Sequence, residues 1–228
     1  MVDLFLLPFA GGTSLIYDNW KFSKAVNVIA LDYKGHGFRM RETLYKSFEE
    51  MIGDIHNQIL QKRTCSSITI FGHSMGGLVA WDVARNFSEA ENNLKIIISA
   101  CLPPHLFNEK LYSEMATDNW LFNFLIQYSR VDQDRIKSKF FQDKIYPTIR
   151  NDYHLISVHK HETINKTLFD IACFYGEDDK LMPQNGMEQW RSYTTQRFLL
   201  RKFKGEHFYI EDETNRKELI TTIESFIQ

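Results

Sequence analysis

The stretch Ile68–Leu78 reads ITIFGHSMGGL, and it decides the fold of this 228-residue chain. Its β-branched and aromatic start ends at Gly72, Ser74 follows two residues later, and two glycines then open a segment with helical periodicity. That order predicts a strand, a tight turn and a helix. A Gly-x-Ser-x-Gly motif in this context is the nucleophile-elbow pattern, in which small neighbours permit a strained serine whose hydroxyl projects above the sheet. Ser74 is therefore the candidate nucleophile.

The motif alone is short, and in an ordinary loop it would be a turn without chemistry. The strand and helix patterns on either side favour a catalytic serine. Because a serine hydroxyl is a weak nucleophile at neutral pH, the rest of the chain must then supply a general base, an acid and an oxyanion hole.

Strand and helix patterns alternate along most of the chain, which indicates a mostly parallel sheet joined by right-handed crossovers. The predicted fold class is α/β, with a sheet of about six strands flanked by helices. The apolar run Leu4–Leu7 is typical of a buried strand and opens onto the glycine-rich loop Pro8–Ser14. Further strands are expected at Ala25–Asp32, Lys95–Cys101, Thr167–Tyr175 and Arg197–Phe203, and helices at Ser47–Gln61 (with a Ser47/Glu50 capping box), near Gln184–Tyr193 and at about Thr214–Ile227.

The alternation stops between about Leu111 and Thr167, where there is no strand signal and helices are expected at Tyr112–Tyr128 and Gln133–Gln142. A helical block between two strands of a parallel sheet is most simply a lid over the carboxyl ends of the strands. We therefore expect one domain, residues 1–228, with a helical lid inserted at about 106–166. The lid is rich in aromatic residues that look exposed: Trp120, Phe122, Phe124, Tyr128, Phe140, Phe141 and Tyr146.

Composition narrows the possible partners and the compartment. The formal net charge is -2 and the sequence pI about 6.4, so nothing attracts the whole chain to nucleic acid or to an anionic membrane, and neither is expected as a partner. The three cysteines, Cys65, Cys101 and Cys173, have no paired spacing and are interpreted as reduced thiols. With no signal-peptide pattern and no run long enough to span a bilayer, a cytoplasmic location is expected. The expected oligomeric state is a monomer.

The base and the acid are expected on loops after the last two strands. In strand–turn–serine–helix hydrolases the chain order is Ser, then Asp or Glu, then His. His207 follows the last expected strand in Gly205-Glu206-His207, and it is the candidate base. The preceding loop offers three carboxylates, Glu177, Asp178 and Asp179. A Gly-x-x-Asp turn directs its fourth residue back toward the strand ends, which favours Asp179, with Asp178 as the alternative.

The oxyanion hole of an acyl-transfer enzyme needs two aligned N–H donors. One candidate is the backbone N–H of Met75, the residue after the nucleophile and the start of a helix. The other is expected from the loop after the first strand, where Ala10 is favoured and Phe9 is the alternative.

Other histidines receive structural interpretations. His73 is expected to pack behind the elbow, and His36, between two glycines, to be a turn residue. The His159–Glu162 segment (HKHE) resembles a metal cluster, but histidines two apart lie on different helical faces, so it is interpreted as surface. No metal and no cofactor are expected.

These motifs together resemble the type II thioesterases, discrete α/β-hydrolase enzymes that accompany non-ribosomal peptide synthetases and polyketide synthases. The likeness covers nearly the whole chain. Where the family often has Gly-Arg-Gly this chain has Gly35-His36-Gly37, and where it often has Asp-Pro this chain has Asp179-Lys180. The resemblance rests on Leu7–Gly12, Tyr17, Trp20, Gly35–Arg39, Glu42, Phe71–Gly77, Leu102–His105, Pro147–Asp152, Trp190 and Gly205–Tyr209.

The resemblance implies hydrolysis of acyl groups held as thioesters on the phosphopantetheine arm of a carrier protein, which clears mis-primed or stalled groups. Ser74 would form the acyl-enzyme, His207 would protonate the departing thiol and then activate water, and Asp179 would orient His207. Acyl or peptidyl carrier domains are the expected partners, docked weakly and transiently. The alternative within enzymes is a carboxylesterase or lipase that acts on free esters with the same residues.

Overall fold

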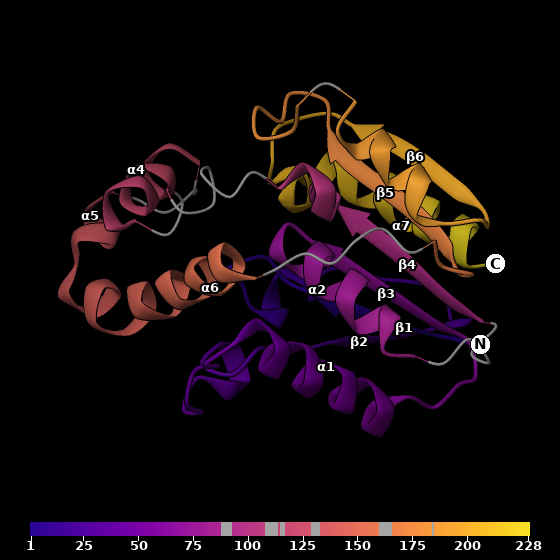
Figure 1. Cartoon of the computed structure of the whole chain (residues 1–228), viewed down its shortest axis with the longest axis horizontal. Coiled ribbons are helices and arrows are strands. Elements are labelled where there is room, and N and C mark those ends of the chain that lie inside the picture. The colour runs from indigo at the N-terminus through magenta and orange to yellow at the C-terminus, as the bar shows by residue number, and fades with distance from the viewer. Residues whose placement is uncertain (88–92, 108–113, 115–116, 129–132, 160–165, 184) are drawn as a thin grey trace.

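The computed structural model describes residues 1–87, 93–107, 114, 117–128, 133–159, 166–183 and 185–228. Six parallel strands form one sheet in the order β2-β1-β3-β4-β5-β6 (Figure 1). This confirms the predicted fold class. The strands are β1 (Val2–Leu7), β2 (Val26–Ala30), β3 (Ile68–His73), β4 (Leu94–Ser99), β5 (Asp170–Gly176) and β6 (Phe198–Phe203).

The strand order reverses between β1 and β3. The chain runs outward from β1 to β2 and then returns to place β3 on the other side of β1, so the loops after β1 and β3 leave the same edge of the sheet next to each other. Ligands of doubly wound sheets bind at such a switch point. The glycine-rich loop after β1 and the elbow after β3 therefore meet because of the topology.

Alternate residues of the strands pack against helices on opposite faces of the sheet. Phe5 and Leu7 belong to the core formed with α1 (Phe48–Lys62) and α2 (Met75–Arg85). Leu4 and Leu6 belong to the core formed with α7 (Glu213–Ile227). Because side chains alternate along a strand, a continuous apolar run is what a strand buried on both faces requires.

Between β4 and β5 the described part of the chain is helical. Figure 1 shows α4 (Asp118–Tyr128), α5 (Gln133–Lys137) and α6 (Tyr146–Val158) grouped at one end of the molecule, with α6 leading back toward α2. These three helices, named the lid helices below, share a small apolar core of their own. Its buried members are Leu121, Phe124, Leu125, Ile136, Phe141, Ile149 and Tyr153.

Several details of the lid differ from the prediction. Phe124 and Phe141 are buried in the lid core rather than exposed, whereas Phe140 is exposed. The helix expected at Gln133–Gln142 ends at Lys137, and a π-helical turn at Phe141–Ile145 leads into α6. The expected start of the previous helix, residues 112–113 and 115–116, lies outside the described residues.

Two other elements also depart from the sequence pattern. The segment expected as a helix near residue 184 is a 3-10 helix at Met187–Tyr193, and residue 184 itself is outside the described part. At the start of α1, the Ser47 hydroxyl accepts the Glu50 N–H at 3.1 Å as expected of an N-cap. The Glu50 carboxylate, however, accepts the N–H of Lys46 instead of returning to Ser47, so the capping box is displaced by one residue.

None of the helices in the described residues is long and apolar enough to cross a membrane. The three cysteines are free, with Cys101 and Cys173 buried.

Candidate active site

Ser74 sits in a strained turn between β3 and α2, with φ 54° and ψ -119°. Such a backbone is unfavourable for a residue with a side chain, and the surrounding contacts must hold it. A Cβ on Gly72 would lie 1.9 Å from the Gly76 carbonyl oxygen, and a Cβ on Gly76 would lie 2.4 Å from that of Leu7. The two glycines therefore allow strand, helix and first loop to approach closely enough to raise the serine above the sheet.

His207 connects the predicted nucleophile with the predicted acid. Its Nε2 lies 3.0 Å from Ser74 Oγ, and its Nδ1 lies 2.8 Å from Asp179 Oδ2. Asp179 and His207 are both almost completely buried. These distances are those of a nucleophile, a base and a group that orients the base.

Of the competing carboxylates, only Asp179 reaches the histidine. The Asp179 N–H donates to the Gly176 carbonyl at 3.2 Å, which closes the expected Gly-x-x-Asp turn. The second Asp179 oxygen accepts the Leu181 N–H at 2.9 Å, which fixes the carboxylate plane. Glu177 and Asp178 point to solvent from the same turn.

The loop after β1 forms a turn at Phe9–Gly12. The Gly12 N–H donates to the Phe9 carbonyl at 2.8 Å, and Gly11 has φ +75°, as position i+2 of a type II turn requires. Because a trans peptide directs its C=O and N–H to opposite sides, the Ala10 N–H points out of the turn. Across the switch point, Met75 begins α2, so its N–H has no carbonyl partner within the helix. Both N–H groups are suited to bind an anion.

Buried hydroxyls and a carboxylate hold this loop on both sides. The Tyr17 hydroxyl donates to the Leu7 carbonyl at 2.8 Å and the Tyr33 hydroxyl to the Pro8 carbonyl at 3.0 Å. Burial raises the pKa of both tyrosines well above the ordinary value, so both remain neutral donors. Asp32 accepts the Ser14 N–H at 2.6 Å at the end of the loop.

His73 packs behind the elbow, as expected from the sequence. It is fully buried, its Nδ1 lies 2.8 Å from Ser99 Oγ, and Ser99 Oγ lies 2.6 Å from the Tyr209 hydroxyl. Burial lowers the pKa of His73 well below the ordinary value, and the neighbouring His207, whose ring centroid is 5.3 Å away, lowers it further. A neutral His73 adds no positive charge beside the base.

A cavity of about 290 Å³ adjoins Ser74 and His207, between the sheet edge and the lid. Trp120 and Phe124 from α4 stack at 4.9 Å in its wall, and Tyr153 of α6 lies beside them. Lys180 is the one cationic residue in the described lining. Other lining residues are mostly apolar: Met75, Leu78, Ala100, Cys101, Leu102, Phe107, Ile156, Leu181 and Met182.

Asp152 of α6 is a site residue for which the sequence reasoning gave no role. Its Oδ2 accepts the Gly11 N–H at 2.7 Å and lies 2.8 Å from His36 Nε2, although the residues are 141 and 116 positions apart. The interpretation of His36 as a plain turn residue was incomplete, because His36 is buried and paired. Both residues lie in segments on which the family resemblance rests, Gly35–Arg39 and Pro147–Asp152. That resemblance was the signal in the sequence that could have indicated them.

The structure corrects the interpretation of the HKHE segment at its first residue. His159 is largely buried, its Nε2 lies 2.8 Å from Asp82 Oδ2, and its ring lies 4.3 Å from that of Phe48, so it is not a simple surface residue. Residues 160–162 lie outside the described part. Among the described residues, no group of three or more His, Cys, Asp or Glu side chains could hold a metal ion.

The sequence pattern of the Thioesterase domain family matches residues 2–227. The chain belongs to the thioesterase domain family. It is therefore a hydrolase of thioesters, which confirms the resemblance drawn from its motifs. Thioesterase TesA of Mycobacterium marinum is 31% identical over 229 residues, covering 97% of this chain and 89% of its own length. Thioesterase PikA5 of Streptomyces venezuelae is 25% identical, over 93% of this chain and 76% of its own.

Solved structures share the fold of this thioesterase. ClbQ from the colibactin NRPS/PKS pathway superposes with a TM-score of 0.84 at 23% identity, over 98% of this chain and 97% of its own. RedJ, the thioesterase from the prodiginine biosynthetic pathway in Streptomyces coelicolor, superposes with a TM-score of 0.84 at 24% identity, over 98% and 85% of the two chains.

Proposed function

We propose that this thioesterase is a type II enzyme that removes acyl groups from the phosphopantetheine arm of carrier proteins. The observation that carries the proposal is the hydrogen-bonded series Ser74–His207–Asp179 at the floor of a mostly apolar cavity. An apolar wall suits an acyl chain, and the pair of N–H groups beside the serine suits the anion that forms when a thioester carbonyl is attacked.

Acylation begins at Ser74 Oγ. The oxygen attacks the thioester carbonyl carbon while His207 Nε2 accepts the hydroxyl proton, and the carbonyl π electrons move onto oxygen. The N–H groups of Ala10 and Met75 donate to that oxyanion. Asp179 holds the Nδ1–H of His207 and stabilises the imidazolium. The C–S bond then breaks, and His207 returns the proton to the departing thiolate, which leaves an acyl-serine ester and a free pantetheine thiol.

Deacylation repeats the same steps with water. His207 Nε2 takes a proton from a water molecule, whose oxygen attacks the ester carbonyl, and the same N–H groups bind the second oxyanion. Collapse of this intermediate returns the proton to Ser74 Oγ and releases the carboxylic acid. The enzyme needs no cofactor of its own in this scheme, because the phosphopantetheine arrives on the substrate.

The names of relatives support the biosynthetic setting of this proposal. A match at 21% identity over 91% of this chain is named Gramicidin S biosynthesis protein GrsT, from Aneurinibacillus migulanus, and ClbQ acts in an NRPS/PKS pathway. We propose acyl or peptidyl carrier domains as transient partners of a monomeric enzyme. A cytoplasmic location is part of the same proposal, and the free cysteines agree with a reducing compartment.

The test compares thioester and ester hydrolysis. Butyryl-loaded carrier protein, butyryl-pantetheine and an oxygen ester of matched acyl length are supplied to the enzyme, and thiol and acid release are followed. We expect kcat/KM to be highest for the loaded carrier and lost in Ser74→Ala. An overwhelming preference for the free oxygen ester would replace this proposal with the carboxylesterase alternative.

A further inference from the structure

A buried ion pair joins three segments that are far apart in the sequence. His36 follows β2, Asp152 lies in lid helix α6, and Gly11 belongs to the turn after β1. Asp152 Oδ2 contacts both others, with the Gly11 N at 2.7 Å and His36 Nε2 at 2.8 Å. The side chains of His36 and Asp152 are 2% and 1% exposed. Burying a charged group costs free energy unless the group is paired and hydrogen-bonded with good geometry. Asp152 and His36 are therefore expected to hold each other in this arrangement.

The contact fixes the one peptide of the turn that its own hydrogen bond leaves free. The Gly12-to-Phe9 hydrogen bond sets the ends of the turn, but turns of types I and II share it and differ in the direction of the central peptide. That central peptide carries the Gly11 N–H, which Asp152 binds. Asp152 therefore selects the type II form by setting ψ of Ala10 and φ of Gly11. The Ala10 N–H, the proposed oxyanion donor, belongs to the preceding peptide, so Asp152 acts on it by anchoring the turn that carries it.

Lid helix α6 packs on the same turn through a second residue. A Cβ on Gly11 would lie 2.5 Å from Ile149 Cγ1, so Ile149, one turn before Asp152, lies directly against the Gly11 backbone. The glycine is needed both for its positive φ and for this approach. The lid helix and the oxyanion turn are thus in van der Waals and hydrogen-bond contact.

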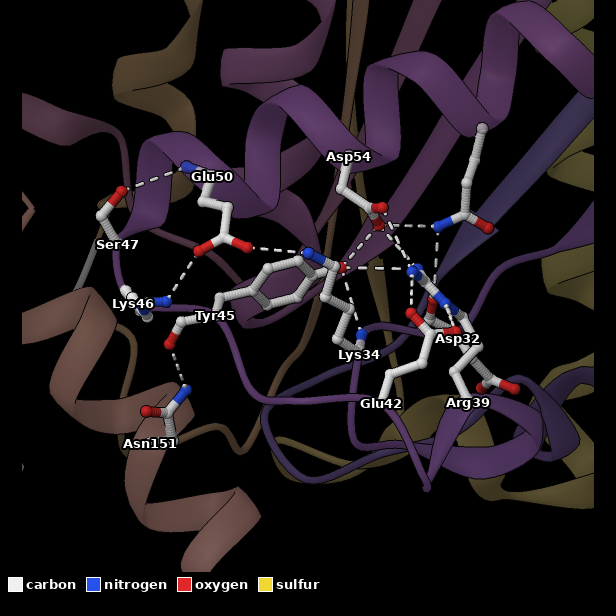
Figure 2. Close-up of polar contacts among 11 residues, drawn as sticks. Asp32, Lys34, Arg39, Glu42, Tyr45, Lys46, Ser47, Glu50, Asp54 and Asn151 are labelled. Atoms are coloured by element: carbon white, nitrogen blue, oxygen red, sulfur yellow. Dashed lines mark hydrogen bonds and ion pairs between the residues drawn. The ribbon is translucent and has the colours of Figure 1, made fainter.

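The segment that carries His36 is itself held in place. Figure 2 shows Arg39 between Glu42 and Asp54 of α1, with the Arg39-to-Asp54 contact at 2.6 Å. In the same view the Asn151 side chain of α6 reaches the Tyr45 carbonyl, at 3.2 Å. Adjacent residues of α6, Asn151 and Asp152, therefore bind the same segment.

The hydrogen bonds of His36 require both of its ring nitrogens to be donors. Nδ1 lies 3.1 Å from the Lys34 carbonyl oxygen and Nε2 faces the Asp152 carboxylate, and only an imidazolium donates from both. Burial opposes this charge, but Asp152 and the Lys34 carbonyl, with a contribution from Asp32, outweigh burial and raise the pKa of His36.

The other ionisable groups around the pair do not replace this charge. Tyr33, whose ring lies 5.6 Å from that of His36, and Tyr153, next to Asp152, have pKa values raised by burial and stay neutral. The Lys34 ammonium is 2.7 Å from Glu50 instead. Within the described part of the chain, Asp152 Oδ1 is buried without a hydrogen-bond partner, so the charge of Asp152 is compensated at Oδ2, by His36 and the Gly11 N–H.

We propose that Asp152, paired with protonated His36, is a positioning residue that holds the oxyanion turn in its donor conformation and ties it to lid helix α6. The inference rests on the proposed function only for the role of the Ala10 N–H. A lid displacement that moved Asp152 would release the turn, so the oxyanion hole is complete only with α6 in place.

The first experiment measures hydrolysis of p-nitrophenyl butyrate by Asp152→Ala, with His154→Ala as the matched control, because His154 is exposed on the same helix. Loss of a correctly placed oxyanion donor costs about 100-fold in kcat, and we expect a loss of about 10- to 100-fold for Asp152→Ala with KM changed by less than about twofold. His154→Ala should match the wild type. A folded Asp152→Ala with a wild-type kcat would overturn the proposal.

The second experiment compares the pH dependence of the wild type with that of His36→Arg. Because the pKa of folded His36 is raised, its charge persists at low pH and is lost as the pH rises through that value, so wild-type kcat should decline at alkaline pH. A permanently charged arginine should keep kcat near the wild-type value and remove this decline. If kcat declines identically at alkaline pH in the wild type and in His36→Arg, the role of His36 is refuted. This comparison does not depend on whether Asp152→Ala folds.

The ester assay reports serine chemistry whatever the natural acyl donor is. A wild type that cleaves the ester but not an acyl-loaded carrier would contradict the proposed function and leave the positioning role standing. A wild-type kcat in Asp152→Ala together with a wild-type pH dependence in His36→Arg would contradict the positioning role alone.

Discussion

Replacing Asp179 with asparagine tests how the acid controls the base. Asp179 uses both oxygens, with Oδ1 accepting the Leu181 N–H at 2.9 Å and Oδ2 facing His207 Nδ1 at 2.8 Å. Asparagine has one oxygen and one NH₂ group. If its oxygen keeps the Leu181 N–H, the NH₂ group meets His207 Nδ1 and stabilises the tautomer whose proton is on Nε2. That tautomer cannot accept the Ser74 proton.

The size of the effect follows from this tautomer. The same substitution in a serine-protease triad lowers kcat by about 10,000-fold, and each tenfold corresponds to about 1.4 kcal/mol, so the barrier should rise by ~5 kcal/mol. The reverse amide orientation would place the asparagine NH₂ group against the Leu181 N–H, two donors facing each other, so this orientation is disfavoured. KM should change little, because Asp179 is outside the residues that line the acyl cavity.

The assay is steady-state hydrolysis of p-nitrophenyl butyrate and of butyryl-pantetheine, with Asp178→Asn as the control. Asp178 is exposed and lies one position before Asp179. Its substitution by asparagine removes the same charge from the same turn. Its variant should retain kcat within about twofold, as surface substitutions usually do. A larger loss in Asp178→Asn than in Asp179→Asn would exchange their roles and refute the reasoning.

Three further outcomes are expected. Ser74→Ala should abolish turnover and fluorophosphonate labelling with an unchanged unfolding midpoint, and wild-type turnover would exclude Ser74 as nucleophile. Gly72→Ala, whose Cβ would lie 1.9 Å from a carbonyl oxygen, should lose about 3 kcal/mol of unfolding free energy in urea. Gly53→Ala, whose Cβ would meet no atom of the described residues within 4 Å, should gain about 0.5–1 kcal/mol, and equal effects would contradict this packing. For Asp3, burial alone would raise the pKa, but hydrogen bonds from Asn27, Cys65 and Thr64 outweigh burial and lower it. Asp3→Asn should therefore be destabilising above about pH 4, with a difference that shrinks as pH falls through the lowered pKa; a pH-independent difference would refute the linkage.

Local patterns predicted the features that local geometry determines. The elbow could be predicted because both of its glycines, Gly72 and Gly76, lie two residues from Ser74. Asp179 could be predicted because the Gly-x-x-Asp turn is formed by four consecutive residues. The sheet followed from apolar runs that bury both strand faces. The catalytic roles of these residues remain predictions until the substitutions above are made.

Contacts between distant segments could not be predicted in the same way. Nothing near His36 or Asp152 in the sequence indicates that they meet, because their pairing depends on where α6 lies. The aromatic residues of the lid were expected to be exposed, but some of them pack against other lid helices instead of against the sheet. Phe124 and Phe141 belong to the same buried cluster as Ile149 and Tyr153 of α6, which the spacing within one helix does not reveal.

The packing of α7 has a consequence for what holds the base beside the nucleophile. Asn215 in α7 donates to the Lys204 carbonyl at 2.8 Å and to the Tyr209 carbonyl at 3.0 Å, which clamps both ends of the loop that carries His207. The His207 loop keeps this clamp only while α7 is docked, whereas the position of Ser74 is set by β3 and α2. The two halves of the site therefore depend on different parts of the fold, and loosening of α7 alone would separate the base from a nucleophile that stays in place.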